Sequence, residues 1–556
     1  MVACMNPIDE IAERHVSEFA RLNPVGATAV GIVGYDDLMS DLSPDGFDAR
    51  AELDAATIAA LGQVSVDDYA GQVARQAMLE RLTVASELYR SGATTSDLNV
   101  ISSWVQGVRQ VFDLMPVDGH EAQHNLAARM TAVPAAYAGL RRTYREAAAR
   151  GQVAARRQVI ACAKQCAEWS APDSGFYYLL TERTGADGAM RADLDRAAAA
   201  ASAATAELGI FLEQELLPLA PEPDAVGRER YSLASRSFLG ATLDLDEAYA
   251  WGWAEVQRIE DDMARVAGEI TPSGMVPEAV AVLESDAARK ITGRQALRDW
   301  MQGLADATIA ELDGRHFDIP EPARRIEAMI APTSDGGIYY TGPSEDWTRP
   351  GRMWWALANG VEEFSTWKEV TTIYHEGVPG HHLQVAQAVF LRDRLNRWQR
   401  LLSWVSGHGE GWALYAERLM DELGYLADPG NKLGMLDAQL LRAARVVVDI
   451  GVHLQLPIPA DSRWYPGQTW NADLAWEYLR SRVQVEEEML RFELNRYLGW
   501  PGQAPSYKLG ERIWLQARDD ARQRKGADFD LKEFHSQALA LGSLGLDPLR
   551  EALARL

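Results

Sequence analysis

The 556-residue sequence predicts a mainly α-helical protein with one small β-sheet. Apolar residues recur at helical spacing over most of the chain. The exception is a stretch between residues 325 and 357, where short apolar or aromatic runs are separated by Gly, Pro and Asp. The chain shows no internal repeat and no long Pro- or Ser-rich linker. We therefore expect one interlocked domain over residues 1–556, with approximate lobes at 1–290 and 291–556.

The helices are predicted, in chain order, from apolar periodicity and capping residues. From about residue 8 to residue 146, helical patches alternate with short loops, and the Gly-, Pro-, Asp- and Ser-rich stretch 23–48 is expected to be an ordered connection. Asp244 is expected to cap a helix, with Glu247 three residues later in a capping arrangement. Long helices are predicted at Asn125–Ala149, Arg191–Leu216 and Leu245–Ala267.

Three short segments are predicted to pair as the small sheet: Arg325–Ile330, Gly337–Thr341 and Arg352–Leu357. They lie just before the most unusual motif of the chain. An extended peptide can add itself to an exposed sheet edge as a further strand. The sheet could equally be a hairpin that only covers the core, and the sequence leaves both interpretations open.

Composition limits the partners that the protein can bind. A net charge of −25 argues against nucleic acid and anionic membranes, because both are polyanions. No window approaches about 18 uninterrupted apolar residues, and residues 1–10 lack the basic and apolar parts of a signal peptide. Three cysteines cannot build a disulfide framework, and Cys162 and Cys166 are expected to share one buried helix face. We expect a soluble, cytoplasmic protein of undetermined oligomeric state.

Three of the ten histidines surround one glutamate in residues 374–384, which read YHEGVPGHHLQ. In the metalloprotease motif His-Glu-x-x-His, two histidines four residues apart on one helical face hold zinc, and the glutamate is the general base. Here Pro379 occupies the position four residues after His375. The segment therefore predicts a zinc site, with Glu376 as the base, in a geometry that departs from the motif.

A regular helix cannot build this site. His381 would lie on the far side of the helix from His375, and His382 would stand roughly 10 Å further along the axis. Neither allows two imidazoles to lie about 2.0–2.1 Å from one ion. Pro379 disrupts a helix and the neighbouring glycines tolerate unusual dihedrals, so we expect a widened, looped-out turn that brings His381 to the ion. His382 would then be an outer or substrate-facing group, or the alternative second ligand.

A catalytic zinc site generally has three protein ligands, and a carboxylate is the expected third. Glu410 is predicted to open a helix that runs to Leu423, and glycines on both sides of it would let backbone and metal approach closely. Glu417, two turns later on the same face, is the alternative. Only one of them should be close enough to ligate, and the other is expected to support a ligand from outside.

The segments 375–384 and 409–417 (GEGWALYAE) resemble the bacterial domain-of-unknown-function 885 family, helical proteins placed near the gluzincin metallopeptidases. The likeness extends to residues 23–28 and 34–37 near the start and to 500–508 near the end, so it covers nearly the whole chain. It implies a gluzincin-like, two-lobed helical body with a small sheet beside the metal-binding helix. It also implies a zinc-dependent amide or peptide hydrolase, with the substrate left open.

Attack of water on an amide builds an oxyanion that needs a hydrogen-bond donor opposite the metal. His453 is one candidate, because it lies on a predicted helix where Asp449 could orient it. Tyr507, in one of the family-like segments, is the other. The alternatives are a satisfied core histidine and a tyrosine that only packs.

Other residues near the motif have both a functional and a structural interpretation. Arg442 and Arg445 could bind a substrate carboxylate bidentately, or could form salt bridges with Asp449 or with the glutamates at 486–488. His408 could approach the metal, although a loop histidine without a metal role is the default. Several tryptophans could line an apolar cleft or pack in the core: Trp347, Trp354, Trp355, Trp404 and Trp412.

Together these residues predict a hydrolase with one zinc ion per chain that cleaves amide bonds of short peptides or amino-acid amides. His375, His381 and Glu410 would hold the zinc, and Glu376 would accept a proton from water and pass it to the leaving amine. The alternatives are a hydrolase of a non-peptidic amide or ester, a catalytically inactive metal-binding or scaffold protein, and an interaction protein in which the motif is only a structural break. Aminopeptidase, carboxypeptidase, dipeptidase and endopeptidase activities all stay open.

Overall fold

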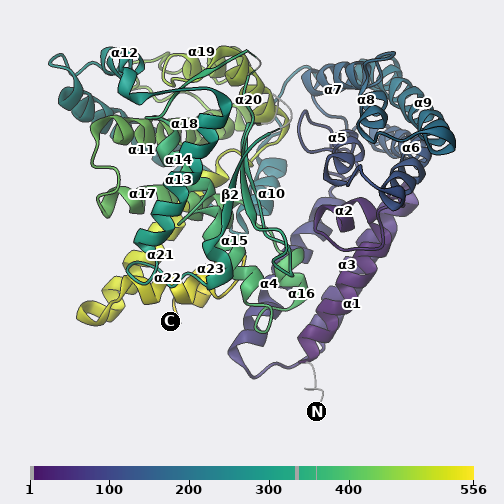
Figure 1. The fold of residues 1–556 in the computed structure, drawn as a ribbon, viewed down its shortest axis with the longest axis horizontal. Coiled ribbons are helices and arrows are strands. Elements are labelled where there is room, and N and C mark those ends of the chain that lie inside the picture. The colour runs from purple at the N-terminus through teal and green to yellow at the C-terminus, as the bar shows by residue number, and fades with distance from the viewer. Residues whose placement is uncertain (1–5, 332–336, 359, 556) are drawn as a thin grey trace.

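The computed structural model describes residues 6–331, 337–358 and 360–555, and these residues are mainly helical (Figure 1). The first five residues, which belong to the segment without signal-peptide features, lie outside the described part. The chain begins with α1 (Pro7–Leu22), α2 (Pro24–Ala29), α3 (Pro44–Gly62) and α4 (Tyr69–Arg90). A polar N-cap starts each of these four helices, with Asn6, Asn23, Ser43 and Asp68 each accepting a hydrogen bond from a backbone N–H of the first turn.

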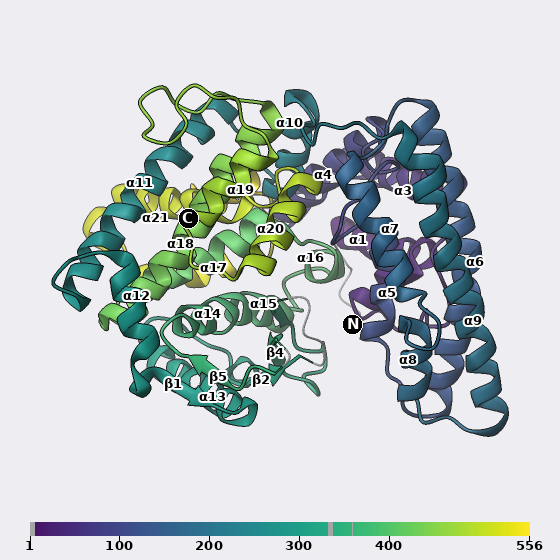
Figure 2. The ribbon, with the colours of Figure 1, turned by 90° about the horizontal axis from the view of Figure 1, so that it is seen from above.

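The next five helices form a body beside the rest of the chain, at the right of Figure 2. They are α5 (Trp104–Gln110), α6 (His120–Ala149), α7 (Arg156–Trp169), α8 (Phe176–Arg183) and α9 (Gly188–Phe211). This body has its own apolar core, to which Val25 and Leu42 also contribute. Cys162 and Cys166 both lie in it on the buried face of α7, which confirms the prediction of a shared buried face.

The remaining helices share a second, larger core with α1, α3 and α4. The two cores do not divide the chain at residue 290, because α1, α3 and α4 share the larger core with the helices from α10 onward. The predicted division into two lobes near residue 290 stays a prediction. The helices are α10 (Arg228–Leu239), α11 (Leu245–Ile270), α12 (Val276–Ser285), α13 (Arg294–Leu312), α14 (Glu369–Glu376), α15 (His381–Phe390), α16 (Arg397–Leu401), α17 (Ser406–Glu422), α18 (Pro429–Leu454), α19 (Ala472–Arg480), α20 (Glu487–Gly499), α21 (Ser506–Lys525), α22 (Leu531–Leu539) and α23 (Leu546–Leu553).

The long predicted helices are present, with shifted ends. α6 begins earlier than expected, α11 extends further, and α9 ends at Phe211 before a π-helical turn over Leu212–Leu216. Asp244 accepts hydrogen bonds from the backbone N–H groups of Asp246 and Glu247, which confirms it as the cap of α11. The Glu247 carboxylate pairs with Arg512 and does not return to the cap.

A three-stranded sheet forms where the sequence predicts it, in the order β2–β4–β3. Its strands are β2 (Ile326–Ile330), β3 (Ile338–Thr341) and β4 (Gly351–Trp355). β2 runs parallel to β4 with Ile326 opposite Gly351, and β3 runs antiparallel to β4 with Ile338 opposite Trp355. α13 packs on β2, and α15 contacts β4, so the sheet lies beside the second half of the motif.

A second sheet was not predicted. β1 (Lys290–Thr292) pairs with β5 (Glu363–Ser365) in antiparallel register. Strands of three residues are too short for an alternating pattern to be recognised in the sequence. In the described part of the chain, no helix has both the length and the apolar character needed to cross a membrane.

Candidate metal centre

Two separate helices carry the predicted histidines. α14 ends at Glu376 and α15 begins at His381, and the Val378–Pro379 peptide bond in the loop between them is cis. A Cβ on Gly380 would lie 1.9 Å from the carbonyl oxygen of His375, so only glycine allows the chain to return this closely. The expected looped-out turn in one helix is therefore corrected to a break between two helices.

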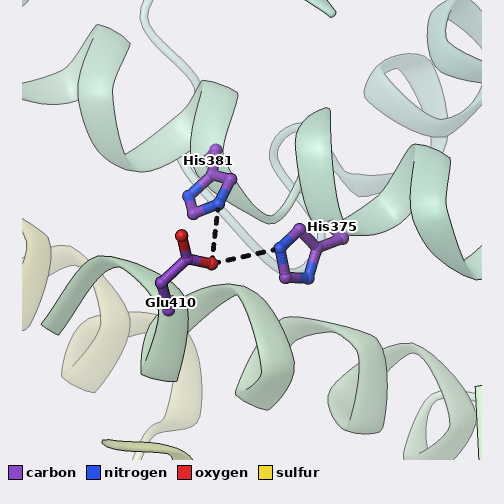
Figure 3. A group of neighbouring side chains, drawn as sticks. All are labelled: His375, His381 and Glu410. Atoms are coloured by element: carbon purple, nitrogen blue, oxygen red, sulfur yellow. Dashed lines mark ion pairs between the residues drawn. The ribbon is translucent and has the colours of Figure 1, made fainter. Parts of the chain in front are cut away.

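α17 carries Glu410 and lies across from the two helices that carry His375 and His381 (Figure 3). It also holds the loop between those two helices in place. Trp412 donates from Nε1 to the Pro379 carbonyl oxygen at 2.9 Å. α17 begins at Ser406, so Glu410 lies inside the helix and does not open it as predicted. Gly411 serves helix packing: a Cβ there would lie 2.4 Å from the carbonyl carbon of Gly510, so this glycine permits the close crossing of α17 and α21.

His375, His381 and Glu410 converge on one point, as Figure 3 shows. Glu410 Oε2 lies 3.4 Å from His375 Nε2 and 3.4 Å from His381 Nε2. The three ligand atoms all lie within 4.8 Å of one another. Both histidines are buried, and 16% of the Glu410 side chain is exposed. The structure thus brings together the three residues that the sequence predicts as ligands.

The residues of this group fit a zinc ion. In a tetrahedral zinc site with bonds of about 2.0–2.1 Å, neighbouring ligand atoms stand about 3.3–3.4 Å apart. The two distances from Glu410 Oε2 agree with that separation. Glu410 Oε2 is buried and has no hydrogen-bond partner among the described residues, although both histidines are near it. A shared cation would satisfy this oxygen and both ring nitrogens.

Glu417 lies behind His375 and outside the group. Its Oε1 is 2.7 Å from His375 Nδ1, and its Oε2 accepts a hydrogen bond from Thr371 Oγ1 at 2.8 Å. Both carboxylate oxygens are therefore used, in a side chain that is fully enclosed. This contact orients the His375 ring with Nε2 toward Glu410, as carboxylates commonly do behind metal-binding histidines.

Glu376 has a free oxygen beside the group. The residue is 6% exposed, and its Oε2 has no hydrogen-bond partner in the described part of the chain. Burial raises the pKa of Glu376, while the charges of His375 and His381 act in the opposite direction. A carboxyl group with a raised pKa and a free oxygen is suited to accept a proton and return it.

The charges around His375 favour a cation. Burial by itself would lower the pKa of His375, but its contacts with the Glu410 and Glu417 carboxylates outweigh burial and raise this pKa to about 10. Burial likewise acts to raise the pKa of Glu410. The charge of His381 and the contact with His375 outweigh burial, so the pKa of Glu410 is lowered overall. A metal cation would meet the same field, and ligation requires the histidine to release its proton.

His382 faces away from the group. Its Nδ1 lies 2.9 Å from the Tyr340 hydroxyl of β3, and its Nε2 lies 2.8 Å from the Ala323 carbonyl oxygen. Burial lowers the pKa of His382 to about 4, so the ring is neutral. The expectation of a substrate-facing group is wrong, because none of the side chain is exposed. His382 ties α15 to the sheet.

The two predicted oxyanion donors lie in different places. Tyr507, on α21, has a pKa that burial and then the Glu410 charge raise to about 12, so a protonated phenol lies within electrostatic reach of the group. His453 is fully buried, with Nε2 3.0 Å from the Tyr497 carbonyl oxygen and its ring against Tyr231. The proposed role of His453 is corrected on this ground, because the residue offers no surface to a substrate.

The other residues near the motif are mostly structural. His408 is buried, and its Nδ1 accepts the Leu544 backbone N–H at 2.8 Å, so the default interpretation applies. Trp355 and Trp412 lie in the core. Trp404 is 53% exposed, and its ring centroid is 6.1 Å from that of His381. Of these three tryptophans, Trp404 forms an apolar wall beside the group.

Two contacts that shape the site were not predicted. One is the bond from Trp412 to the loop between the histidines, and the other is the bond between Tyr340 and His382. The Glu376 charge also acts on the Tyr340 phenol, which places that strand residue near the base. Each contact joins segments far apart in the chain, so no local sequence signal could have revealed it.

A separate cavity of about 1000 Å³ lies between the two bodies. Its lining includes Trp104 of α5, Arg230 and Phe238 of α10, and Trp500. None of His375, His381 and Glu410 lines it. The cavity and the candidate metal group are therefore distinct features of the molecule.

The comparisons with known proteins agree on family and fold. A family described as "Bacterial protein of unknown function (DUF885)" matches residues 24–553. The fold is similar to that of "the putative lipoprotein from Colwellia psychrerythraea", with a TM-score of 0.85, 22% identity and 99% coverage of both chains. It is also similar to that of "a putative lipoprotein of unknown function from Shewanella oneidensis", with a TM-score of 0.74, 17% identity and 99% coverage of both chains. No curated protein matches the chain.

Proposed function

The chain belongs to this family of bacterial proteins of unknown function, and from its buried histidine–glutamate group we propose that it is a zinc-dependent hydrolase. The bond cleaved would be an amide bond of a short peptide or an amino-acid amide. We further propose a gluzincin-like relationship, in which the histidine pair and Glu410 hold one zinc ion per chain.

The observation that carries this proposal is the convergence of His375, His381 and Glu410. The Glu410 oxygen lies at tetrahedral zinc spacing from each histidine nitrogen, all three ligand atoms lie within 4.8 Å of one another, and no other described residue satisfies this buried oxygen. The group also has the two features that a catalytic site needs beyond ligands. Glu417 orients His375 from behind, and Glu376 holds a free carboxylate oxygen beside the group.

Each residue has a distinct task in the proposed reaction. When bound, zinc supplies an activated water and polarises the substrate carbonyl group. Glu376 accepts the proton of the attacking water and delivers it to the nitrogen of the leaving amine. The Tyr507 phenol, which stays protonated, donates a hydrogen bond to the oxygen on which negative charge develops.

The burial of the site supports a small substrate. His375, His381 and Glu376 are each less than a tenth exposed, so a chain end can enter more easily than a folded protein. β3 is an edge strand of the sheet, and Tyr340 on it lies near Glu376. An extended peptide could pair with this edge and present its amide to the group.

Two other functions use the same group. A non-peptidic amide or ester would need the same water and the same base, and a protein that binds zinc without catalysis would not need Glu376. The free, buried carboxylate of Glu376 favours an enzyme over a scaffold. The cytoplasmic location expected from the sequence stays a prediction that fractionation of the producing cells would test.

The test combines metal analysis with an activity screen. Protein purified without added metal should contain, or take up, about one zinc per chain. A mixed peptide library, digested with and without a chelator and analysed by mass spectrometry, should show cleavage that depends on the metal. The matched control is Glu376→Gln, which should keep zinc and lose cleavage. Protein that binds no zinc, or cleavage unaffected by the chelator and by Glu376→Gln, would contradict the proposal.

A further inference from the structure

α18 carries two arginines near the site, and only one of them is already paired. The Arg445 guanidinium donates from Nη2 to Glu493 Oε2 at 2.7 Å and from Nε to the Tyr497 hydroxyl at 2.8 Å. Arg445 is buried, and its positive charge is neutralised by Glu493. It therefore has little capacity left for a ligand.

Arg442, one turn earlier, has no such partner. It donates from Nη1 to the carbonyl oxygen of Ala438 in its own helix, at 3.1 Å. Its Nε is buried without a hydrogen-bond partner, and the guanidinium forms no ion pair in the described part of the chain. The side chain is nevertheless partly exposed, so a ligand can reach it.

Arg442 lies on the side of the site where Glu376 and Glu417 lie. α14, which carries Glu376, packs against α18. The Arg442 charge acts on both carboxylates and contributes to a lower pKa for each, although neither is within ion-pair distance of it. A guanidinium without an ion-pair partner among the described residues thus lies on the helix that packs against the helix of the base, and its side chain is partly exposed.

The chemistry of this position selects an anion. A guanidinium presents its N–H donors in a planar fork that can bind both oxygens of a carboxylate. Such charge-assisted hydrogen bonds are stronger than hydrogen bonds between neutral groups. Glu376, Glu410 and Glu417 already place three carboxyl groups in the site. A substrate carboxylate that enters here needs a neighbouring cation that is not already paired with these residues, and Arg442 is such a cation.

We infer that Arg442 binds the terminal carboxylate of the substrate, so that the enzyme cleaves an amide bond near the C-terminus of a short peptide. This inference rests on the proposed hydrolase function. It narrows that function to a carboxypeptidase or dipeptidase class, because the free carboxylate of a peptide is close to the scissile bond only when the last residues are the ones released.

The experiment compares matched peptides with a free C-terminal carboxylate and with a C-terminal amide. The wild type should cleave the acids with a kcat/KM about 10–100-fold higher than the amides, as expected for a hydrogen-bonded charge pair. Arg442→Gln should lower cleavage of the acids to the level of the amides and leave the amides unchanged. Arg442→Lys should keep part of the preference, and the surface variant Arg512→Gln should keep all of it.

The outcomes separate this inference from the proposed function. Equal cleavage of acids and amides by the wild type, or equal loss of both in Arg442→Gln, would overturn the role of Arg442 and leave the hydrolase intact. If the wild type cleaves no peptide, the test is a binding measurement. Zinc-loaded Glu376→Gln protein should bind peptide acids more tightly than the matched amides, and the Glu376→Gln/Arg442→Gln protein should show no such preference. Equal retention of acids and amides, or retention of neither, would overturn the inference.

Discussion

Two buried carboxylates, Glu410 and Glu493, lie in comparable surroundings and meet different partners. Burial acts to raise the pKa of each, and nearby cationic groups lower it overall. Glu493 is paired with Arg445 and Arg496, with N–O distances of 2.7 and 2.8 Å. Glu410 is held between two histidines at 3.4 Å, without a hydrogen bond to its Oε2.

The two clusters differ in whether the buried carboxylate can exchange its cationic partner. Arginine keeps its proton at any ordinary pH, so the Glu493 cluster is a permanent ion pair. A histidine can release its proton and bind a metal, so the Glu410 group can exchange a proton for a cation. Burial and charge are similar in the two clusters, and the identity of the cationic partner separates a structural site from a candidate metal site.

The largest expected effect is the loss of zinc when a ligand is removed. His375→Ala, His381→Ala and Glu410→Ala should each abolish tight binding, because each removes one of the three proposed protein ligands. Metal analysis after dialysis would measure the zinc per chain. His382→Ala is the matched control and should keep the zinc, since its ring contacts Tyr340 and Ala323 instead. Zinc lost in His382→Ala but kept in His381→Ala would contradict this assignment.

Removing the base should affect turnover without affecting the metal. Glu376→Gln should keep zinc and lower kcat by about 10²–10⁴-fold, because an amide cannot accept the proton of the attacking water. The measurement is steady-state cleavage of the best peptide from the library screen. A variant with near-normal kcat would exclude Glu376 as the base.

Breaking the Glu493 cluster should lower the stability of the protein and leave the metal site unchanged. Glu493→Ala leaves two buried arginines without their carboxylate and should lower the free energy of unfolding by about 3–5 kcal/mol. Zinc content should not change. Denaturant unfolding measures the first quantity and metal analysis the second. A Glu493→Ala protein of normal stability that loses zinc would mean that the two clusters are one functional unit.

Glu417→Ala should give a smaller change in the metal site. Its carboxylate orients His375 and does not belong to the ligand group, so zinc affinity should fall by about 10–100-fold. Competition against a zinc chelator would measure the affinity next to that of Glu410→Ala. If Glu417→Ala lowered the zinc affinity more than Glu410→Ala does, the ligand role would pass from Glu410 to Glu417.

The smallest effect concerns a buried histidine outside both clusters. Burial lowers the pKa of His15 to about 4, and its ordinary pKa is about 6.5. Between these values the unfolded chain binds the proton and the folded protein does not, so stability falls as the pH falls from about 6.5 to 4. His15→Leu should flatten this dependence by up to about 1.4 kcal/mol per pH unit, measured by unfolding at pH 7 and pH 5. An unchanged slope would contradict a neutral His15.

Much of the site could be predicted because it is local. His375 and Glu376 follow from the motif, and the strands follow from short aromatic runs between Gly, Pro and Asp. The cap at Asp244 depends on adjacent backbone groups, and it is present as predicted. Such features depend on residues within a few positions of one another, which is the range over which a sequence pattern carries information.

The helical class, the position of the small sheet and the set of candidate ligands therefore follow from local sequence patterns. Tertiary packing selected between equivalent residues: His381 and not His382 joins the group, Glu410 and not Glu417 joins it, and Arg442, unlike Arg445, has no carboxylate partner among the described residues. Each choice depends on which distant segment a side chain meets. The break after Glu376 turns His382 toward Tyr340, the packing of α14 on α17 places Glu417 behind His375, and α20 supplies the carboxylate that occupies Arg445. These contacts join residues separated by tens of positions, so their geometry exists only once the helices have packed.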